Sequence, residues 1–338
     1  MKEEILGQWA RLYHAAMDIG YMEPWGLLSE GDAFVYVQKG TKRELVFSIL
    51  GQESPFCGIA CYSGWGEFSR ARHRLSGKNS KDEPLFDLQN ALIGIWGTRK
   101  EVSKGNYEVL KTLNLRGHGD GSWLYFEKYR EGYVPQDLNE AEITELAEAL
   151  ENLYMMLRAL YEERLSDYKP GMMVMRWYDE KTKLYYTHPF PMQKLFKIAY
   201  PQVEIKGDEL FHAVMKMPFR EYSLALDWSY IPLPLKDAGK EYIPRLLLGA
   251  DQNDLVLLSE LIVADQDQIG EVLGSMYDLF ESAGKPRSIK IYDEGLEGIL
   301  ADLCKKLGIS LVKTKNLPQI KRLRKELLLS LEATHRRR

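Results

Sequence analysis

Three features are scarce or missing in this chain of 338 residues: cysteine, long apolar runs and a leader segment. Three cysteines are too few for a disulfide framework, so we expect a reducing compartment, the cytoplasm. The best candidate for a membrane helix, residues 255–264, contains Ser259 and Glu260 and falls short of the roughly 20 apolar residues required. The N-terminus, residues 1–5, has neither the basic nor the apolar region of a secretory signal. These absences predict a cytoplasmic protein without a membrane partner.

The remaining composition is that of an ordinary globular protein. Hydrophobic residues make up 45% of the chain and charged residues 28%, which argues against disorder and against a fibrous repeat. Because domains commonly have about 150 residues, the length predicts two of them.

The net charge of -4 conceals an asymmetry along the chain. Residues 285–338 hold fourteen Lys or Arg against six Asp or Glu, a net charge of +8, which leaves -12 for residues 1–284. Such a split is compatible with a polyanion partner, nucleic acid included, or with a solvated helix face followed by a basic tail. The candidate nucleic-acid-binding residues on the last predicted helix are Lys321, Arg322, Arg324 and Lys325.

The first half of the chain predicts an α+β domain with an antiparallel sheet. Apolar residues spaced three and four apart over residues 5–19 indicate an opening amphipathic helix. Asn139 and Glu142 predict a capping box at the start of a long helix that runs to about Arg164. The polar stretch 69–84 is predicted to be a surface loop. Short β-rich segments punctuated by Gly and Pro are predicted as strands at residues 33–37, 44–50, 58–62, 92–96 and 123–128.

A Pro-Gly break at residues 167–171 predicts the domain boundary, which divides the chain into residues 1–168 and 169–338. The second domain is predicted to begin with a β-hairpin, at residues 172–178 and 183–187. A mixed α/β domain of order β-β-β-α-β-α-β-α follows. Its predicted elements are residues 222–230, 245–250, 255–262, 265–282, 288–292, 296–306 and 309–312, and a final helix from Leu317.

This order is the one used by ribonuclease-H-like folds, and the local sequence resembles the catalytic core of integrases and transposases. The similar pieces are ALDW at 225–228, PRLLLGAD at 244–251 and GKPRSIKIYDEG at 284–295. Nearly the whole chain also resembles a bacterial family of unknown function. That second resemblance implies a two-domain bacterial protein and no chemistry, and it is carried by SILG at 48–51, YSGWG at 62–66, GYVP at 132–135 and the C-terminal pieces.

The integrase resemblance implies a carboxylate site that would hold Mg²⁺ or Mn²⁺ for phosphoryl transfer on nucleic acid. By position, Asp227 on the first strand and Asp293 at the end of the fourth match the first two acids of the triad. Glu326 is the third by separation, although the motif that surrounds it in the family is absent. Asp227 alternates out of phase with Leu226, whereas Asp293 is in phase with Ile291. The alternative is that Asp293 caps the next helix and that Glu326 is a solvated helix residue.

Two other motifs bear on chemistry. Cys57 and Cys61 share a face if their strand alternates, but zinc needs two further ligands, so two buried apolar side chains are favoured. His118, in the glycine-rich stretch 117–121, is interpreted as part of a polar turn. The aromatic residues, 11% of the chain, are assigned mostly to the core, although Tyr and Trp can line a ligand groove or stack on single-stranded nucleic acid.

The sequence therefore predicts a protein of unknown function that binds a protein or polyanion partner without catalysis and without a cofactor. The alternative is a phosphoryl-transfer enzyme of the nuclease kind, dependent on a divalent metal and acting on nucleic acid.

Overall fold

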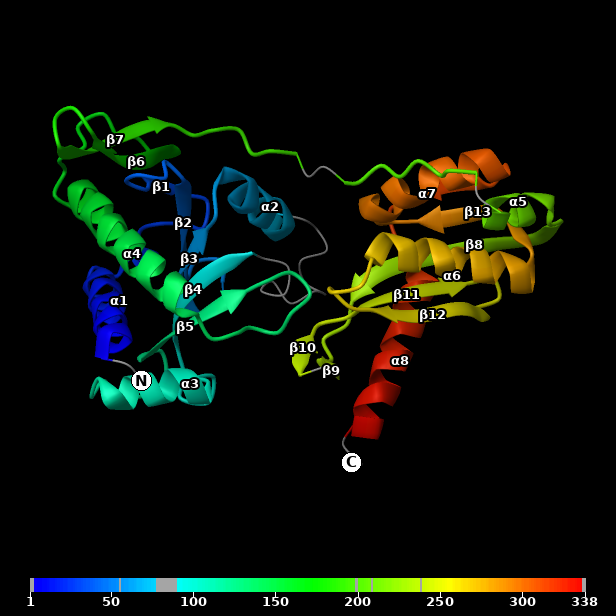
Figure 1. Cartoon of the computed structure of the whole chain (residues 1–338), viewed down its shortest axis with the longest axis horizontal. Helices are drawn as coiled ribbons and strands as arrows, with labels where there is room; N and C mark the ends of the chain where they lie inside the picture. Colours follow the sequence, from blue (N-terminus) through cyan, green and yellow to red (C-terminus); the bar gives the residue numbers. More distant parts are fainter. Residues whose placement is uncertain are drawn as a thin grey trace. The chain divides into compact units, whose positions relative to one another are not determined.

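The computed structural model describes residues 3–54, 56–76, 90–197, 200–207, 209–237 and 239–335 (Figure 1). The chain combines helices with mixed sheets, the predicted α+β class, and divides into two compact units. The first unit comprises Met1–Glu131 and Pro135–Ile198, and the second comprises Gly132–Val134 and Ala199–Arg338. Each unit has a sheet of its own. In the parts of the chain given above, no helix is long and apolar enough to cross a membrane.

The first unit is built on a seven-stranded sheet of order β5-β4-β3-β2-β1-β6-β7. All its neighbouring strands are antiparallel except β1 and β6, which are parallel. Five of the six neighbouring pairs are thus antiparallel, as predicted, and the pair β1–β6 is the exception. The strands are β1 (Phe34–Val37), β2 (Glu44–Leu50), β3 (Cys57–Tyr62), β4 (Ala91–Gly97), β5 (Trp123–Tyr129), β6 (Met172–Asp179) and β7 (Leu184–Pro191).

The hairpin β6–β7 corrects the predicted domain boundary. Phe34 of β1 pairs with Val174 of β6, so the hairpin completes the first sheet instead of opening the second domain. The first unit continues to Ile198, not to residue 168. The Pro-Gly break follows the end of α4. It does not end the domain, because the next strand, β6, pairs with β1 of the first sheet.

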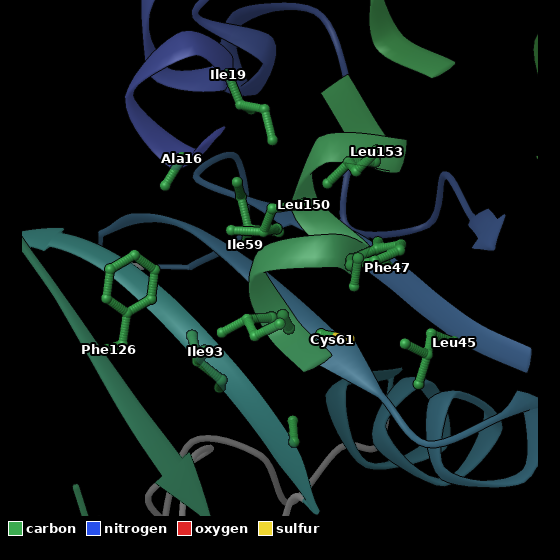
Figure 2. Packing of buried hydrophobic residues seen from close by; sticks show 14 of the residues in the cluster. Ala16, Ile19, Leu45, Phe47, Ile59, Cys61, Ile93, Phe126, Leu150 and Leu153 are labelled. Carbon is green, nitrogen blue, oxygen red and sulfur yellow. The ribbon is translucent and has the colours of Figure 1, made fainter. Parts of the chain in front are cut away.

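Helices α1 (Glu3–Tyr21) and α4 (Glu140–Tyr161) cover one face of this sheet. The ring of Phe126 on β5 lies 5.0 Å from that of Tyr13 on α1, and the hydroxyl of Tyr36 on β1 donates to Glu148 on α4 at 2.5 Å. Figure 2 shows this core, in which strand residues meet side chains of both helices. The capping box of Asn139 and Glu142 is present as predicted.

Helix α2 (Trp65–Ser76) packs on the opposite face, against β2 and β3. The rings of Tyr62 and Phe68 lie 5.8 Å apart there. The predicted loop at 69–84 is thus wrong up to Ser76, and its remainder falls among residues 77–89, outside the described ranges. The unit is completed by α3 (Lys104–Thr112) and the short 3-10 helix η1 (Pro24–Gly26).

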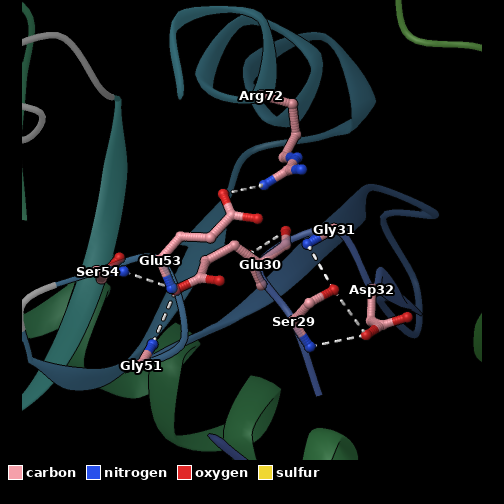
Figure 3. Close-up of polar contacts among 9 residues, drawn as sticks. Ser29, Glu30, Gly31, Asp32, Gly51, Glu53, Ser54 and Arg72 are labelled. Atoms are coloured by element: carbon pink, nitrogen blue, oxygen red, sulfur yellow. Dashed lines mark hydrogen bonds and ion pairs between the residues drawn. The ribbon is translucent and has the colours of Figure 1, made fainter. Parts of the chain in front are cut away.

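A buried carboxylate organises the loop between β2 and β3 (Figure 3). Glu30 is completely buried, and its Oε1 accepts the backbone N–H groups of Gly51 at 2.9 Å, Glu53 at 2.9 Å and Ser54 at 3.0 Å. Its own backbone oxygen accepts the hydroxyl of Ser48 at 2.7 Å. Burial alone would raise the pKa of Glu30, but these backbone donors outweigh it and the pKa is lowered. The charged side chain therefore holds this loop.

We expect Glu30→Gln to destabilise the protein by about 2–4 kcal/mol at neutral pH, because a neutral amide replaces a buried carboxylate that satisfies three N–H groups. A lowered folded pKa stabilises the protein above the unfolded pKa of about 4.3, and this contribution is lost as the pH falls through the folded value. The difference in free energy of unfolding between the wild type and Glu30→Gln, measured with urea, should therefore become smaller at acidic pH. Glu53→Gln, whose exposed carboxylate lies 3.8 Å from Arg72, is the control and should change little.

The second unit is built on a five-stranded sheet of order β12-β11-β8-β13-β14. Strands β8, β11 and β12 form an antiparallel meander, and β13 and β14 follow parallel to β8. This confirms the predicted order β-β-β-α-β-α-β-α. The elements are β8 (Phe219–Tyr230), β11 (Arg245–Ala250), β12 (Val256–Ile262), α6 (Gln268–Ala283), β13 (Lys285–Ile291), α7 (Glu294–Leu307), β14 (Ser310–Lys313) and α8 (Pro318–His335), with α5 (Glu209–Lys216), β9 (Leu235–Asp237) and β10 (Lys240–Tyr242) as additions.

One apolar cluster lies on each face of this second sheet. Leu226 and Ile289 pack with α6 and α7 on one face. Ala225 and Leu248 pack with Ile320 of α8 on the other. Because side chains alternate along a strand, a shift of one residue moves a side chain from one cluster to the other.

Candidate functional site

Asp227 lies on the α8 face of the second sheet, where it is paired in register with Leu248. Its carboxylate accepts the hydroxyl of Ser229 at 2.8 Å, and the oxygen of Ser229 accepts from Arg324 on α8, also at 2.8 Å. This chain of hydrogen bonds ties β8 to α8. The first acid of the expected triad therefore has a structural role.

Asp293 follows the end of β13 and is the N-cap of α7. Its carboxylate accepts the N–H of Leu296 at 2.9 Å, which confirms the capping interpretation. Burial raises its pKa, and the charge of Asp227 raises it further, while the N–H of Leu296 and the charge of Arg245 oppose the rise. The structure thus brings Asp227 and Asp293 near enough for their charges to interact.

Glu326, the third acid, lies exposed on α8. Within the ranges that the structure describes, no group of three or more His, Cys, Asp or Glu side chains could hold a metal ion. Asp227 lies on the α8 face of β8, and Asp293 lies beyond the end of β13, at the start of α7. The predicted Mg²⁺ or Mn²⁺ site rests on two acids and stays a prediction.

Substitution of Asp293 separates capping from metal binding. Asn is as good an N-cap as Asp, so Asp293→Asn should keep or slightly raise the melting temperature at neutral pH, whereas Asp293→Ala should cost about 1 kcal/mol. Because the folded pKa of Asp293 is raised, the wild type should lose stability relative to Asp293→Asn as the pH rises from about 4 through that pKa.

The same variants test the metal in a thermal-shift measurement. We expect millimolar Mn²⁺ or Mg²⁺ to leave the melting temperature of the wild type unchanged. A rise that occurs in the wild type and is lost in Asp293→Asn would instead assign a metal to this pair of acids.

The basic residues of α8 are partly engaged within the protein. Arg322 forms an ion pair with Asp254, Arg324 donates to Ser229, and Lys321 and Lys325 are exposed. Other cations of the same C-terminal segment have internal partners too, which reduces the charge available to a polyanion. These pairs are Lys285 with the backbone oxygen of Met215, Arg287 with Glu221, Lys306 with Asp302, and Lys313 with Glu294 and Glu297.

The cysteine pair and the glycine-rich loop match their structural interpretations. Cys57 is half-buried and Cys61 fully buried on β3, and burial raises the pKa of both thiols. Their strand partners on β4 are Trp96 and Leu92, which are apolar. His118 is exposed, and Gly119 and Gly121, which follow it, adopt positive φ.

One carboxyl group outside the predicted set has a strongly perturbed pKa. Burial raises the pKa of Glu127 on β5 to about 7, and the charges of Asp137 and Glu101 add to the rise, against a hydrogen bond from the hydroxyl of Tyr129 at 3.0 Å. Perturbed groups mark functional sites only when a ligand-binding feature accompanies them. Glu127 therefore bears on stability rather than on a site.

Because the folded protein holds a proton on Glu127 up to about pH 7, while the unfolded chain releases it near pH 4.3, stability should fall as the pH rises between these values. Glu127→Gln should remove this dependence and exceed the wild type by about 1–3 kcal/mol at pH 8. Urea unfolding across this pH range measures the difference. If the free energy of unfolding depends on pH equally in the two proteins, the raised pKa of Glu127 is contradicted. Glu108→Gln, on the exposed surface of α3, is the matched control.

The aromatic side chains of the β6–β7 hairpin form a cluster that the sequence did not single out. Trp177 lies at its centre, with ring centroids 5.9 Å from Tyr186, 5.7 Å from His188 and 6.1 Å from Phe190. The planes of Trp177 and Tyr186 differ by 23°, and those of Tyr186 and His188 by 19°. We call these four residues the Trp177 cluster.

The register of the hairpin places the Trp177 cluster on one face. Trp177 pairs with Tyr186, and the partners of His188 and Phe190 follow at alternate positions on β6. The neighbouring Arg176 donates to Asn152 of α4 at 2.9 Å, so Trp177 points away from the α1–α4 layer. His188 is exposed and Phe190 is 36% exposed, while Trp177 and Tyr186 are half-buried.

The free edge of the hairpin is protected against strand addition. Strand β7 is the last of the sheet, and it carries Pro189 and Pro191, which have no N–H to offer a further strand. Proline on an edge strand is a common defence against pairing with another chain. A partner would therefore meet the aromatic face of this hairpin and not its edge.

Comparison with known proteins attaches no activity to the chain. Residues 9–176 match the family model described as "Domain of unknown function (DUF7309)", and residues 210–328 match the one described as "Domain of unknown function (DUF6930)". No curated protein matches the chain. The solved structures similar to it include the catalytic core domain of HTLV-2 integrase in complex with magnesium, in a dimeric and a trimeric form. In both comparisons the identity is 12%, the match covers 31% of this chain and 66% of that chain, and the TM-score is 0.24, which is too low to carry an argument.

Proposed function

We propose that the chain is a binding protein that contacts its partner through the Trp177 cluster. The observation that carries this proposal is a group of three aromatic rings around that of Trp177, on a partly exposed sheet face. Large aromatic side chains are enriched at the centres of binding surfaces, where they supply most of the affinity. An exposed apolar patch is also a liability for aggregation, so its presence beside a proline-protected edge supports a use in recognition.

The hydrogen bonds of Asp227 and Asp293 support a binding function over a phosphoryl-transfer activity. Asp293 caps α7, and Asp227 accepts the hydroxyl of Ser229, so both carboxylates contribute to the fold. The second candidate is the metal-dependent phosphoryl-transfer enzyme acting on nucleic acid, and the electrostatic interaction between these two acids favours it. The thermal-shift measurement above decides between the two.

A cytoplasmic location and a bacterial source belong to the same proposal. The thiols of Cys57, Cys61 and Cys304 are free, as suits a reducing compartment. The bacterial source rests on the family resemblance of the short motifs alone.

We expect Trp177→Ala to weaken binding without unfolding the protein. The affinity of the wild type and of the variant is measured against a panel of immobilised probes: single-stranded and double-stranded oligonucleotides, proline-rich peptides and acidic peptides. At least one probe should bind the wild type and lose tenfold or more in affinity with the variant, since a central aromatic side chain is commonly worth 2 kcal/mol or more.

Tyr21→Ala is the matched control, because Tyr21 is a 79% exposed aromatic residue at the end of α1, outside the Trp177 cluster. It should bind and melt as the wild type does, whereas Trp177→Ala, which removes a half-buried ring, should melt at a lower temperature but remain folded at the temperature of the binding assay. If Trp177→Ala binds every probe as tightly as the wild type, or if the wild type binds none, the proposal is wrong.

A further inference from the structure

We infer that the ligand of the Trp177 cluster is single-stranded nucleic acid. The inference rests on the proposed function and adds the class of the partner. Two independent features of the hairpin support it: the arrangement of the rings and the local charge.

The rings of the cluster are arranged for stacking. Tyr186 and His188 project from the same face of β7 with centroids 6.3 Å apart and planes within 19° of each other, and Trp177 lies beside both. Unpaired bases stack on such side chains whatever their sequence, because every base has a π-face. Paired bases are already stacked on each other, so a duplex offers these rings only its edges and backbone. The geometry therefore favours single strands.

The charge of the hairpin complements a phosphate backbone. The hairpin itself, Met172–Pro191, holds three Lys or Arg against two Asp or Glu, and Lys194 and Lys197 just after it bring the net charge of residues 172–197 to +3. Residues 1–198 as a whole hold 25 Lys or Arg against 28 Asp or Glu, so the rest of that stretch has a net charge of -6. The hairpin is thus the basic part of an acidic unit, and opposite charge draws a polyanion to it.

The two acids of the hairpin interact with neighbouring residues of the same turn. The exposed lysines of the hairpin and of the segment after it can therefore contact phosphate groups. Asp179 accepts the N–H groups of Lys181 and Thr182 at 2.8 Å each, and Glu180 pairs with Lys183 at 3.1 Å. The side chains of Lys181, Lys194 and Lys197 are exposed on and just after the hairpin.

A proline-rich peptide is the principal competitor, because aromatic grooves also bind polyproline helices. Such peptides are recognised by ring packing and do not require an excess of positive charge. The charge of the hairpin therefore decides in favour of the nucleic acid, and the peptide becomes an outcome of the test.

The experiment is fluorescence anisotropy of labelled oligo(dT) and oligo(U) of about 12 nucleotides, within the usual site sizes of single-strand binders, with the full-length protein. We expect binding that weakens as salt increases. Trp177→Ala should weaken it by about 5- to 100-fold, the loss that corresponds to one stacked base. Tyr21→Ala should bind like the wild type.

The phosphate contacts are tested by charge reversal. For single strands, the slope of log affinity against log salt changes by about 0.7 for each phosphate contact. The double variant Lys194→Glu/Lys197→Glu should therefore reduce the slope by about 1.4. Two substitutions of the same kind at exposed lysines away from the hairpin, Lys100→Glu and Lys104→Glu, should leave the slope closer to that of the wild type.

Each outcome separates this inference from the proposed function. If the oligonucleotides do not bind, or bind Trp177→Ala equally well, the inference is overturned. If a proline-rich peptide binds and loses affinity with Trp177→Ala while the oligonucleotides do not, the binding function holds and its ligand is a peptide. If a duplex binds as tightly as a single strand and is insensitive to Trp177→Ala, the protein attracts polyanions by charge alone. If no probe depends on Trp177, both proposals fail.

Discussion

The first unit depends on the parallel pairing of β1 with β6. To make this pair, the chain must pass from β5 at one side of the sheet to the far side of β1, a distance of five strand spacings or about 24 Å. Helix α4 has 22 residues and a length of about 33 Å, enough to cross the sheet obliquely while burying Leu150 and Leu153 against the strands. The same crossing delivers the β6–β7 hairpin to the edge of the sheet and so places the Trp177 cluster.

Charged side chains elsewhere in the molecule mostly serve the fold. Glu30 holds a loop through three backbone donors, Asp293 caps a helix, and Asp227 ties β8 to α8 through Ser229 and Arg324. Glu30 is buried and burial raises the pKa of Asp293, as in many catalytic groups, but the hydrogen bonds of all three acids give them structural explanations. The Trp177 cluster differs because its rings lie beside one another and are partly exposed, on a face that the α1–α4 layer does not cover.

Features with local causes were predictable. The capping box of Asn139 and Glu142, the end of α7 at Gly308 and the strand and helix order of the second unit all follow from periodicity or from hydrogen bonds between near neighbours. Helix α2 was missed because its second half reads Ser-Arg-Ala-Arg-His-Arg-Leu-Ser, whose few apolar residues give a weak pattern. Its helical state depends on packing against β2 and β3 instead. The residues of the Trp177 cluster were visible as aromatics, but nothing local distinguished them from core residues.

By itself, the sequence determined the elements with strong local patterns, their caps and their order, because these depend on contacts within a few residues along the chain. Only the tertiary structure decided which strands pair and which faces are covered. The pair Phe34–Val174 joins residues 140 positions apart, and no local signal specifies such a partner. That pairing moved the domain boundary from residue 168 to Ile198 and left the aromatic face of the hairpin partly exposed. In the second unit, the alternation of β8 directed Asp227 to the α8 face, away from the one on which Leu226 and Ile291 are buried. Both results follow from strand register, which a folded sheet sets through long-range burial.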